Sequence, residues 1–155
     1  MKLKIFVVVG LTALASGLAG PFKPIDVRAH TCVDLGEAMY PGMRLYPCDS
    51  LTSQNGRLTL RYQEDGNLVL YDTARTPHVA MWASGPADHN PGYLILQQPT
   101  AVDTNLFIVD GSGAAWFVSR PPCYQDGNLA LIAQNDGNLV LYRDGVAVWD
   151  TATWF

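Results

Sequence analysis

The chain has 155 residues, enough for one domain with a buried core and too few for two ordinary domains. Its 14 acidic residues outnumber 10 basic ones, and the formal net charge of −4 disfavours binding to the phosphates of nucleic acid. We therefore expect a single domain that has no nucleic-acid partner.

The first residues have the layout of a secretory signal. Lys2 and Lys4 precede an apolar run from Ile5 to Leu14, and small residues follow. A membrane anchor is the rival interpretation, but the stretch from Ile5 to Ala19 is only 15 residues long, against about 20 needed to cross a bilayer. The sequence therefore predicts a signal peptide over residues 1–19 and a secreted, extracellular domain over residues 20–155, without membrane insertion.

Three cysteines would meet an oxidising compartment after export: Cys32, Cys48 and Cys123. They allow one intramolecular bridge and leave one thiol over. A bridge between Cys32 and Cys48 closes the shortest loop, and a bridge from Cys123 to the amino-terminal region is the open alternative.

Turn signals punctuate the chain after the signal segment. No window of a dozen residues combines apolar side chains at helical spacing with a capping signal. Short alternating segments are instead separated by dipeptides such as Asn55-Gly56, Asp65-Gly66 and Asp136-Gly137. This pattern predicts an all-β chain of hairpins.

A nonapeptide occurs twice, 71 residues apart. Residues 63–71 and 134–142 both read Gln-x-Asp-Gly-Asn-Leu-Val-Leu-Tyr. Repetition at this fidelity indicates an internal repeat. We call these two segments the first motif and the second motif.

A third, eroded unit lies between the two motifs. Residues 101–109 keep Asp103 and Asn105, but Ala101 stands in place of the glutamine and Val109 in place of the tyrosine. Loss of those two side chains is expected if they serve binding.

Each of the three units is followed by a tryptophan that has alanine two residues before it. The three are Trp82, Trp116 and Trp149. Similar β units that cannot bury their own apolar faces are expected to pack around a shared axis. We expect the tryptophans to fill that axis, and a sugar-stacking role is the alternative.

The spacing within each motif predicts a hairpin with one apolar and one polar face. If the loop is Asp65 to Asn67, Glu64 lies opposite Leu68, and cross-strand partners share a face. The leucines point inward: Leu58, Leu60, Leu68 and Leu70 in the first hairpin, and Leu129, Leu131, Leu139 and Leu141 in the second. The outer faces carry Gln63, Val69 and Tyr71, and Gln134, Val140 and Tyr142.

With the loop residues, each outer face forms a small polar site. The loops add Asp65 and Asn67 to the first site, and Asp136 and Asn138 to the second. A carboxylate, two amides, a phenol and a small apolar floor suit a ligand with several adjacent hydroxyls. The plain alternative is a well-made hairpin, because Asp-Gly-Asn is common turn chemistry. A turn needs neither the glutamine nor the tyrosine, which favours a site.

The pattern Gln-x-Asp-x-Asn-x-Val-x-Tyr resembles that of the bulb-type mannose-binding lectins, a family first known from monocot storage organs. The resemblance runs from about Leu35 to Thr151. It implies a β-prism II fold of three four-stranded antiparallel sheets with pseudo-threefold symmetry and a tryptophan-lined centre. It also implies binding of mannose-containing glycans or glycoproteins without a metal or cofactor.

The resemblance gives each motif residue a role. The 2-hydroxyl of mannose would be held by Asp65 and Asn67 in the first motif, and by Asp136 and Asn138 in the second. The 3-hydroxyl would bond to Gln63 or Gln134, and the 4-hydroxyl to Tyr71 or Tyr142. The ring carbons would touch Val69 or Val140. Asp103 and Asn105 would mark a degenerate third site.

The chain also departs from the family. Gly66 stands where many plant members have a bridged cysteine, and residues 46–49 look like an insertion. Strand exchange through the tail at 151–155, a route to homodimers in the family, stays open.

Two other function classes compete with a lectin. A secreted protein-interaction or toxin module could use the same scaffold after losing sugar binding. An enzyme is disfavoured, because Asp65 and Asp136 lie in separate units whereas a glycosidase needs its carboxylates within roughly 10 Å. The histidines lack ligands at metal-binding spacing: His30, His78 and His89.

Overall fold

The computed structural model describes residues 30–85, 90–97, 105–119 and 127–155. The predicted signal peptide at 1–19 lies outside the described residues, as do Asp103 and Cys123. Within the four described segments there is no helix with the length and apolar character needed to cross a membrane.

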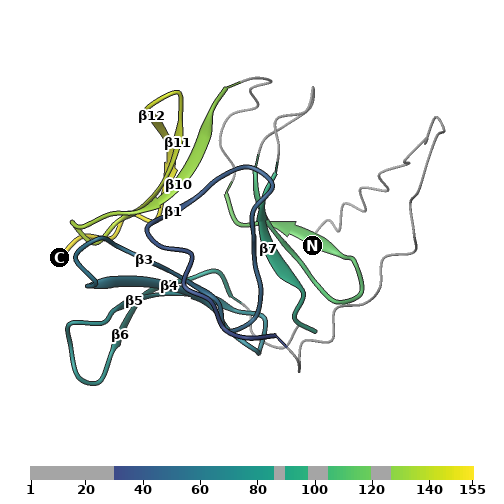
Figure 1. The fold of residues 1–155 in the computed structure, drawn as a ribbon, viewed down its shortest axis with the longest axis horizontal. Coiled ribbons are helices and arrows are strands. Elements are labelled where there is room, and N and C mark those ends of the chain that lie inside the picture. Colours follow the sequence, from purple (N-terminus) through teal and green to yellow (C-terminus); the bar gives the residue numbers. More distant parts are fainter. Residues whose placement is uncertain (1–29, 86–89, 98–104, 120–126) are drawn as a thin grey trace, which may run out of the picture.

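The described residues form twelve strands in three four-stranded sheets (Figure 1). The first sheet has the order β3 (Ser50–Thr52), β4 (Leu58–Tyr62), β5 (Leu68–Asp72) and β6 (Val79–Ala83). The second has β1 (Ala38–Met39), β10 (Leu129–Ala133), β11 (Leu139–Arg143) and β12 (Val146–Asp150). The third has β2 (Arg44–Leu45), β7 (Tyr93–Leu96), β8 (Leu106–Val109) and β9 (Ala115–Phe117).

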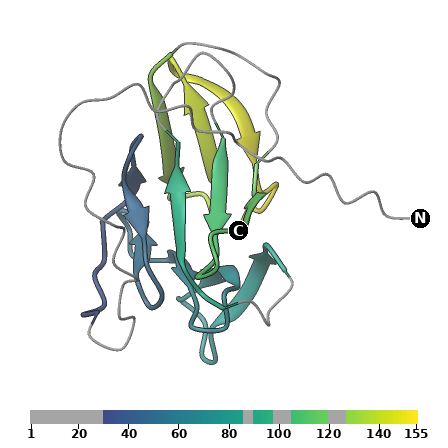
Figure 2. The same ribbon diagram turned by 90° about the vertical axis from the view of Figure 1, so that its right-hand side faces the viewer.

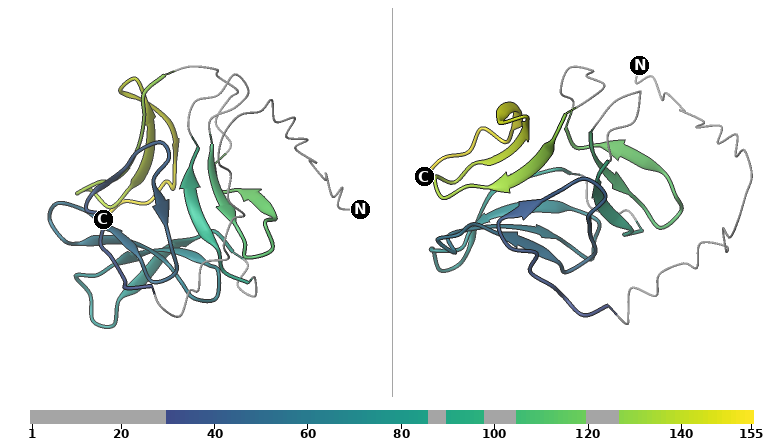
Figure 3. Two further views of the ribbon diagram at one scale, coloured as in Figure 1. Left: turned by 45° about the vertical axis from the view of Figure 1, so that its right-hand side comes forward. Right: turned by 45° about the horizontal axis from the view of Figure 1, so that its top comes forward.

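All strand pairs within the sheets are antiparallel, and the sheets face a common centre (Figures 1 and 3). The all-β class and the three-sheet β-prism implied by the resemblance are thus confirmed. One motif lies in the first sheet and the other in the second, while the eroded unit belongs to the third.

Three short strands distribute one amino-terminal stretch over all three sheets. β1, β2 and β3 follow one another within residues 38–52, yet each becomes the edge strand of a different sheet. This stretch therefore ties the sheets together. Strands of two or three residues are too short to show an alternating pattern, and sequence reasoning missed them.

The inward faces form one buried core. The predicted leucines of both hairpins belong to it, together with Met39, Leu45, Leu94, Leu106 and Ile108. Burial of a leucine side chain contributes about 1.5–3 kcal/mol relative to an exposed one. The separation of inward leucines from the outward motif residues is confirmed.

The predicted hairpin register was wrong by two residues. Leu68 lies opposite Tyr62 rather than Glu64, and the Gln63 N–H donates to the Asn67 carbonyl oxygen at 2.8 Å. The three-residue loop is therefore Glu64–Gly66. Gly66 takes a φ of 82°, and the Asp65 side chain accepts from the Asn67 N–H, so the turn closes before Asn67. A shift by two residues keeps every side chain on its predicted face.

The tryptophans lie on the inward faces of the three sheets. Trp82, Trp116 and Trp149 are opposite Leu70, Ile108 and Leu141 and pack half-buried against the core. Trp82 and Trp149 meet edge to face with ring centroids 6.0 Å apart. The tryptophans thus pack against the core, while the fully buried positions belong mainly to leucines.

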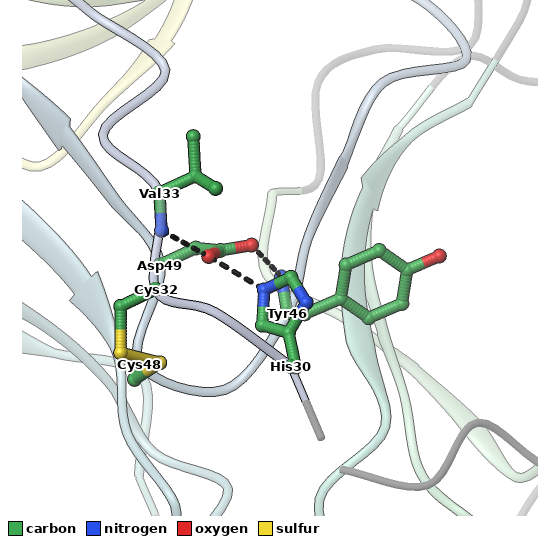
Figure 4. The surroundings of a disulfide bond; sticks show 6 residues. All are labelled: His30, Cys32, Val33, Tyr46, Cys48 and Asp49. Atoms are coloured by element: carbon green, nitrogen blue, oxygen red, sulfur yellow. Dashed lines mark hydrogen bonds and ion pairs between the residues drawn. A yellow bond between two sulfur atoms is a disulfide. The ribbon is translucent and has the colours of Figure 1, made fainter. Parts of the chain in front are cut away.

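The disulfide joins Cys32 to Cys48, the pairing with the shortest loop (Figure 4). Beside it, Asp49 is 2% exposed and accepts hydrogen bonds from the Val33 and Tyr46 N–H groups. Its Oδ1 also lies 2.7 Å from His30 Nε2. The stretch that looked like an insertion thus anchors the amino-terminal residues to the loop between β2 and β3.

Candidate functional site

The first motif brings its glutamine and tyrosine together on the outer face of β4 and β5. Gln63 Nε2 donates to Tyr71 Oη at 2.8 Å, although the residues are eight positions apart. Val69 lies between them in the sequence and on the same face. The amide and the phenol therefore orient one another beside a small apolar side chain.

The loop residues of the first motif lie at the end of this row. Asp65 Oδ1 accepts from the Asn67 N–H at 2.9 Å, which leaves Oδ2 as the outward acceptor. Asn67 Oδ1 accepts from the Gly85 N–H and the Ser84 hydroxyl at 3.0 and 3.3 Å. Because its oxygen is engaged by the protein, the Asn67 side chain has only its NH2 group left for a ligand.

The second motif repeats this arrangement. Gln134 Nε2 donates to Tyr142 Oη at 2.6 Å, and Asp136 Oδ1 accepts from the Asn138 N–H at 3.0 Å. Asn138 Oδ1 accepts from the Thr151 hydroxyl and the Thr153 N–H at 3.0 and 3.3 Å. Two segments 71 residues apart therefore build the same set of donors and acceptors, except that Asn138 Nδ2 also donates to Asp150 Oδ1 at 3.4 Å.

A β-bulge accompanies each motif tyrosine. The pairing of β5 with β6 shifts between Leu70 and Tyr71, and that of β11 with β12 shifts between Leu141 and Tyr142. The bulge sets Tyr71 opposite Ala80, and it sets Tyr142 opposite Ala147. Small neighbours leave room around each phenol, and bulges commonly re-aim a side chain at a binding site.

The chain resembles solved and characterised lectins. No family model matches it. It is 29% identical to the B-type lectin plumieribetin of Scorpaena plumieri over 103 residues, covering 66% of this chain and 83% of the relative. The Japanese Marasmius oreades lectin has a TM-score of 0.64 at 28% identity, covering 80% of this chain and 97% of the other. The monomeric mannose-binding lectins of Gastrodia elata have a TM-score of 0.60 at 32% identity, covering 77% of this chain and 99% of the other.

The chain belongs to the bulb-type lectin family. The likeness extends over nearly the whole of the Gastrodia elata structure. This bulb-type lectin is a carbohydrate-binding protein and not an enzyme.

The carboxyl-terminal tail of this lectin holds the loop of the second motif. β12 completes the second sheet of its own chain (Figure 2), and the tail then turns back to the loop. The Phe155 N–H donates to the Asp136 carbonyl oxygen, and the Thr153 hydroxyl donates to the Gly137 carbonyl oxygen at 2.7 Å. In the first motif, Ser84 and Gly85 meet Asn67 directly after β6.

A second contact joins this loop to the first sheet. The Arg57 guanidinium carbon lies 3.3 Å from the centroid of the Phe155 ring. Arg57 in turn donates two hydrogen bonds to Asp72. Asn55 also bonds to Asn135 through its backbone N–H and its side-chain amide. The second motif is therefore braced by a neighbouring sheet as well as by the tail.

Arg57 also sets the charge state beside the first motif. Its hydrogen bonds, at 3.2 Å to both carboxylate oxygens, lower the pKa of Asp72, and the Ala74 N–H adds to the effect against the opposing effect of burial. Asp72 therefore stays ionised at a lower pH than an unpaired aspartate and keeps Arg57 in place.

The third sheet has a different outer face. The Gln97 N–H donates to the Asn105 carbonyl oxygen at 3.1 Å, so Gln97 occupies the position of Gln63 and Gln134. The alignment of Ala101 with the motif glutamines was therefore wrong. Seven residues separate Gln97 from Asn105, against three in each motif, and this longer loop displaced the sequence alignment.

Beside Gln97, larger apolar and aromatic side chains occupy that face. Tyr93 lies opposite Val109, which holds the position of the motif tyrosines, and Phe107 packs on Phe117 with ring centroids 4.6 Å apart. The register between β8 and β9 is regular, without the bulge of the other sheets. Asn105 is 6% exposed, and its Oδ1 has no hydrogen-bond partner among the described residues.

The second motif opens onto a wider groove, which sequence reasoning missed. The groove has a volume of about 920 Å³. Beyond Gln134 and Tyr142 its lining includes Tyr40, Asn128, Ala130 and Asp144. Tyr40 follows the two-residue strand β1, whose pairing with β10 could not be read from the sequence.

Proposed function

We propose that this lectin is secreted and binds terminal mannose through the first and second motifs, without a metal. One observation carries the proposal: in both motifs the glutamine and the tyrosine meet on one outer face, next to an asparagine whose oxygen is already engaged. The open groups are an amide, a phenol and a carboxylate oxygen. They match the neighbouring hydroxyls of a hexose.

Two further observations support the proposal. The similar Gastrodia elata proteins are mannose-binding lectins. Secretion is supported by the signal-like residues 1–19 and by a disulfide, which persists in oxidising compartments.

Each site is a shallow surface with few contacts, so a monosaccharide should bind with a Kd on the order of 1 mM, about −4 kcal/mol. Two sites on different sheets of one chain can engage two branches of a glycan or two glycans. Such multivalency raises avidity without new contacts. Recognition or crosslinking of mannose-rich surfaces, as in defence, follows from this arrangement, and a homodimer would double the number of sites.

A protein-interaction module is the second candidate. The observation in its favour is that Asp65 and Asp136 each use one carboxylate oxygen to close their turns, as a purely structural hairpin would. The outer face of the third sheet, where Phe107 packs on Phe117, also fits a protein partner better than a sugar.

Retention on immobilised mannose separates the candidates. The double variant Gln63→Ala and Gln134→Ala removes the amides without touching the core, and we expect it to lose retention that free mannose would otherwise release. Gln97→Ala is the matched control, because it removes the glutamine at the same strand position of the third sheet, and it should be retained like the unmodified protein. Unchanged retention of the double variant would overturn the assignment of both sites.

A further inference from the structure

The two motifs differ in what lies beside them. In the second sheet, Tyr40 directly follows Met39, which pairs with Leu131, so Tyr40 continues the row that runs through Ala130 to Tyr142. Tyr40 is 54% exposed. Neighbouring strands are about 4.8 Å apart, which places the two phenol rows roughly 10 Å apart with only an alanine side chain between them.

In the first sheet, two small side chains hold the corresponding positions of this row. Thr52 lies opposite Thr59, and Thr59 lies opposite Tyr71, so these threonines hold the positions of Tyr40 and Ala130. Their hydroxyls lie 3.4 Å apart and bond to one another. The first motif therefore has two threonines bonded to one another, whereas the second motif has the exposed ring of Tyr40 next to the small side chain of Ala130.

The far end of the groove carries polar groups. Asp144 Oδ1 accepts from the Asn128 N–H at 2.9 Å, while its Oδ2 has no hydrogen bond in the described part of the chain. In the first sheet the matching position is Thr73, whose hydroxyl is committed to the Gly56 and Arg57 carbonyl oxygens. Among the residues that the structure describes, the second motif therefore combines a carboxylate oxygen that has no hydrogen bond with an exposed ring, and the first motif lacks this combination at the matching positions.

This combination suits a sugar. A pyranose ring has an apolar face of C–H groups, which packs on an aromatic ring, and an edge of hydroxyls, which donate to a carboxylate. The groove, at about 920 Å³, is at the upper end of the roughly 300–1,000 Å³ of pockets for drug-sized ligands. A single hexose is smaller than such a ligand and leaves the Tyr40 end unfilled.

We propose that Tyr40, Ala130 and Asp144 form a subsite for the pyranose residue linked to the terminal mannose, so that the second motif selects oligosaccharides and the first binds terminal mannose alone. This subsite rests on the proposed function, because Gln134 and Tyr142 must hold the terminal residue. Tyr40 packs on the face of the second residue, and Asp144 Oδ2 accepts from one of its hydroxyls.

The test compares monosaccharide with disaccharide in a protein whose first motif is silenced by Gln63→Ala and Tyr71→Phe. Titration calorimetry or NMR titration gives Kd for methyl α-mannoside and for the methyl glycosides of a panel of α-linked mannobioses. We expect at least one mannobioside to bind about threefold to tenfold more tightly than the monosaccharide. Tyr40→Ala should bring the ratio to within twofold, and Tyr40→Phe should keep it.

Two matched measurements complete the test. Asp144→Asn keeps an oxygen for the Asn128 N–H and removes the charge, so it should reduce the disaccharide preference in part. Thr52→Ala, at the Tyr40 position of the first sheet, should leave the preference unchanged. Equal Kd values for both sugars, or a preference that survives Tyr40→Ala, would overturn the subsite alone. If neither sugar binds even the unmodified protein, the proposed function is overturned as well.

Discussion

The first and third sheets share their strand plan and their inward rows, yet their outer faces have opposite character. Leu70 in the first sheet and Ile108 in the third are both fully buried and lie opposite a tryptophan. On the outside, the first sheet pairs a glutamine amide with a phenol, whereas the third packs Phe107 on Phe117. The inward residues thus maintain the prism, and the outward residues can change without disturbing it.

A second difference lies in the asparagine that ends each outer row. Asn138 shares its oxygen with two groups of the following chain, while the Asn105 oxygen has no partner in the described segments. The same residue therefore links strand and tail in one sheet and contributes little in another. Position in the repeat alone does not tell what a side chain does.

Substitutions of the inward side chains, which the sheets have in common, should cost the most stability. Leu70→Ala, Ile108→Ala and Leu141→Ala each remove a fully buried side chain, and each should lower the free energy of unfolding by about 2–5 kcal/mol. Denaturant unfolding measures the loss. A sheet that tolerates its substitution with less than about 1 kcal/mol would show that the three inward rows are not equivalent.

The next prediction separates the two asparagines. Asn138→Ala leaves the Thr151 hydroxyl and the Thr153 N–H without their acceptor and should cost about 1–3 kcal/mol of stability. Asn105→Ala removes no oxygen contact and should cost less. Thermal unfolding of the two variants side by side checks the order, and an equal loss in both would contradict the distinction.

A smaller effect is expected at the phenols. Tyr142→Phe removes a hydroxyl that bonds Gln134 and, by our proposal, mannose, so binding of methyl α-mannoside at the second motif should weaken by about 1 kcal/mol, or roughly fivefold. Tyr93→Phe in the third sheet should leave mannoside affinity unchanged. NMR titration suits such weak binding, and an equal effect of both substitutions would contradict the assignment.

A still smaller effect is a dependence on pH that involves Asp72 of the first sheet and has no counterpart at the matching position of the second sheet. Because Arg57 lowers the pKa of Asp72 in the folded protein, this carboxylate contributes stability above its ordinary pKa of about 3.9, and the contribution is lost as pH falls through the lowered value. Asp72→Asn should therefore lower stability at neutral pH and flatten its decline in acid. Arg143 holds the matching position of the second sheet, so no carboxylate at that position contributes to the dependence of stability on pH. A decline in acid that is as steep in the variant as in the unmodified protein would contradict this account.

The faces of both hairpins could be predicted from the sequence because strand side chains alternate, and any even shift of register preserves the faces. The register itself could not, because the Asp65 side chain and the positive φ of Gly66 close the turn before Asn67. Only the structure shows that the loop of each motif excludes its asparagine.

Three other features were beyond sequence reasoning for different reasons. Gln97 was missed because its loop is longer than those of the motifs. Counting back the same number of residues as in the motifs therefore led to Ala101, which does not hold the strand position of the motif glutamines. The edge strand β1, and with it Tyr40, has too few residues for a pattern. The cysteine pairing was left open because loop length alone does not fix which cysteines meet.

By our proposal, two of the three sheets bind mannose on their outer faces. Chemical-shift mapping with methyl α-mannoside tests it directly in the unmodified protein. We expect saturable shifts at residues 63–71 and 134–142 with Kd values on the order of 1 mM, and none across β7 and β8. Shifts confined to the third sheet, or absent from both motifs at high sugar concentration, would contradict the account.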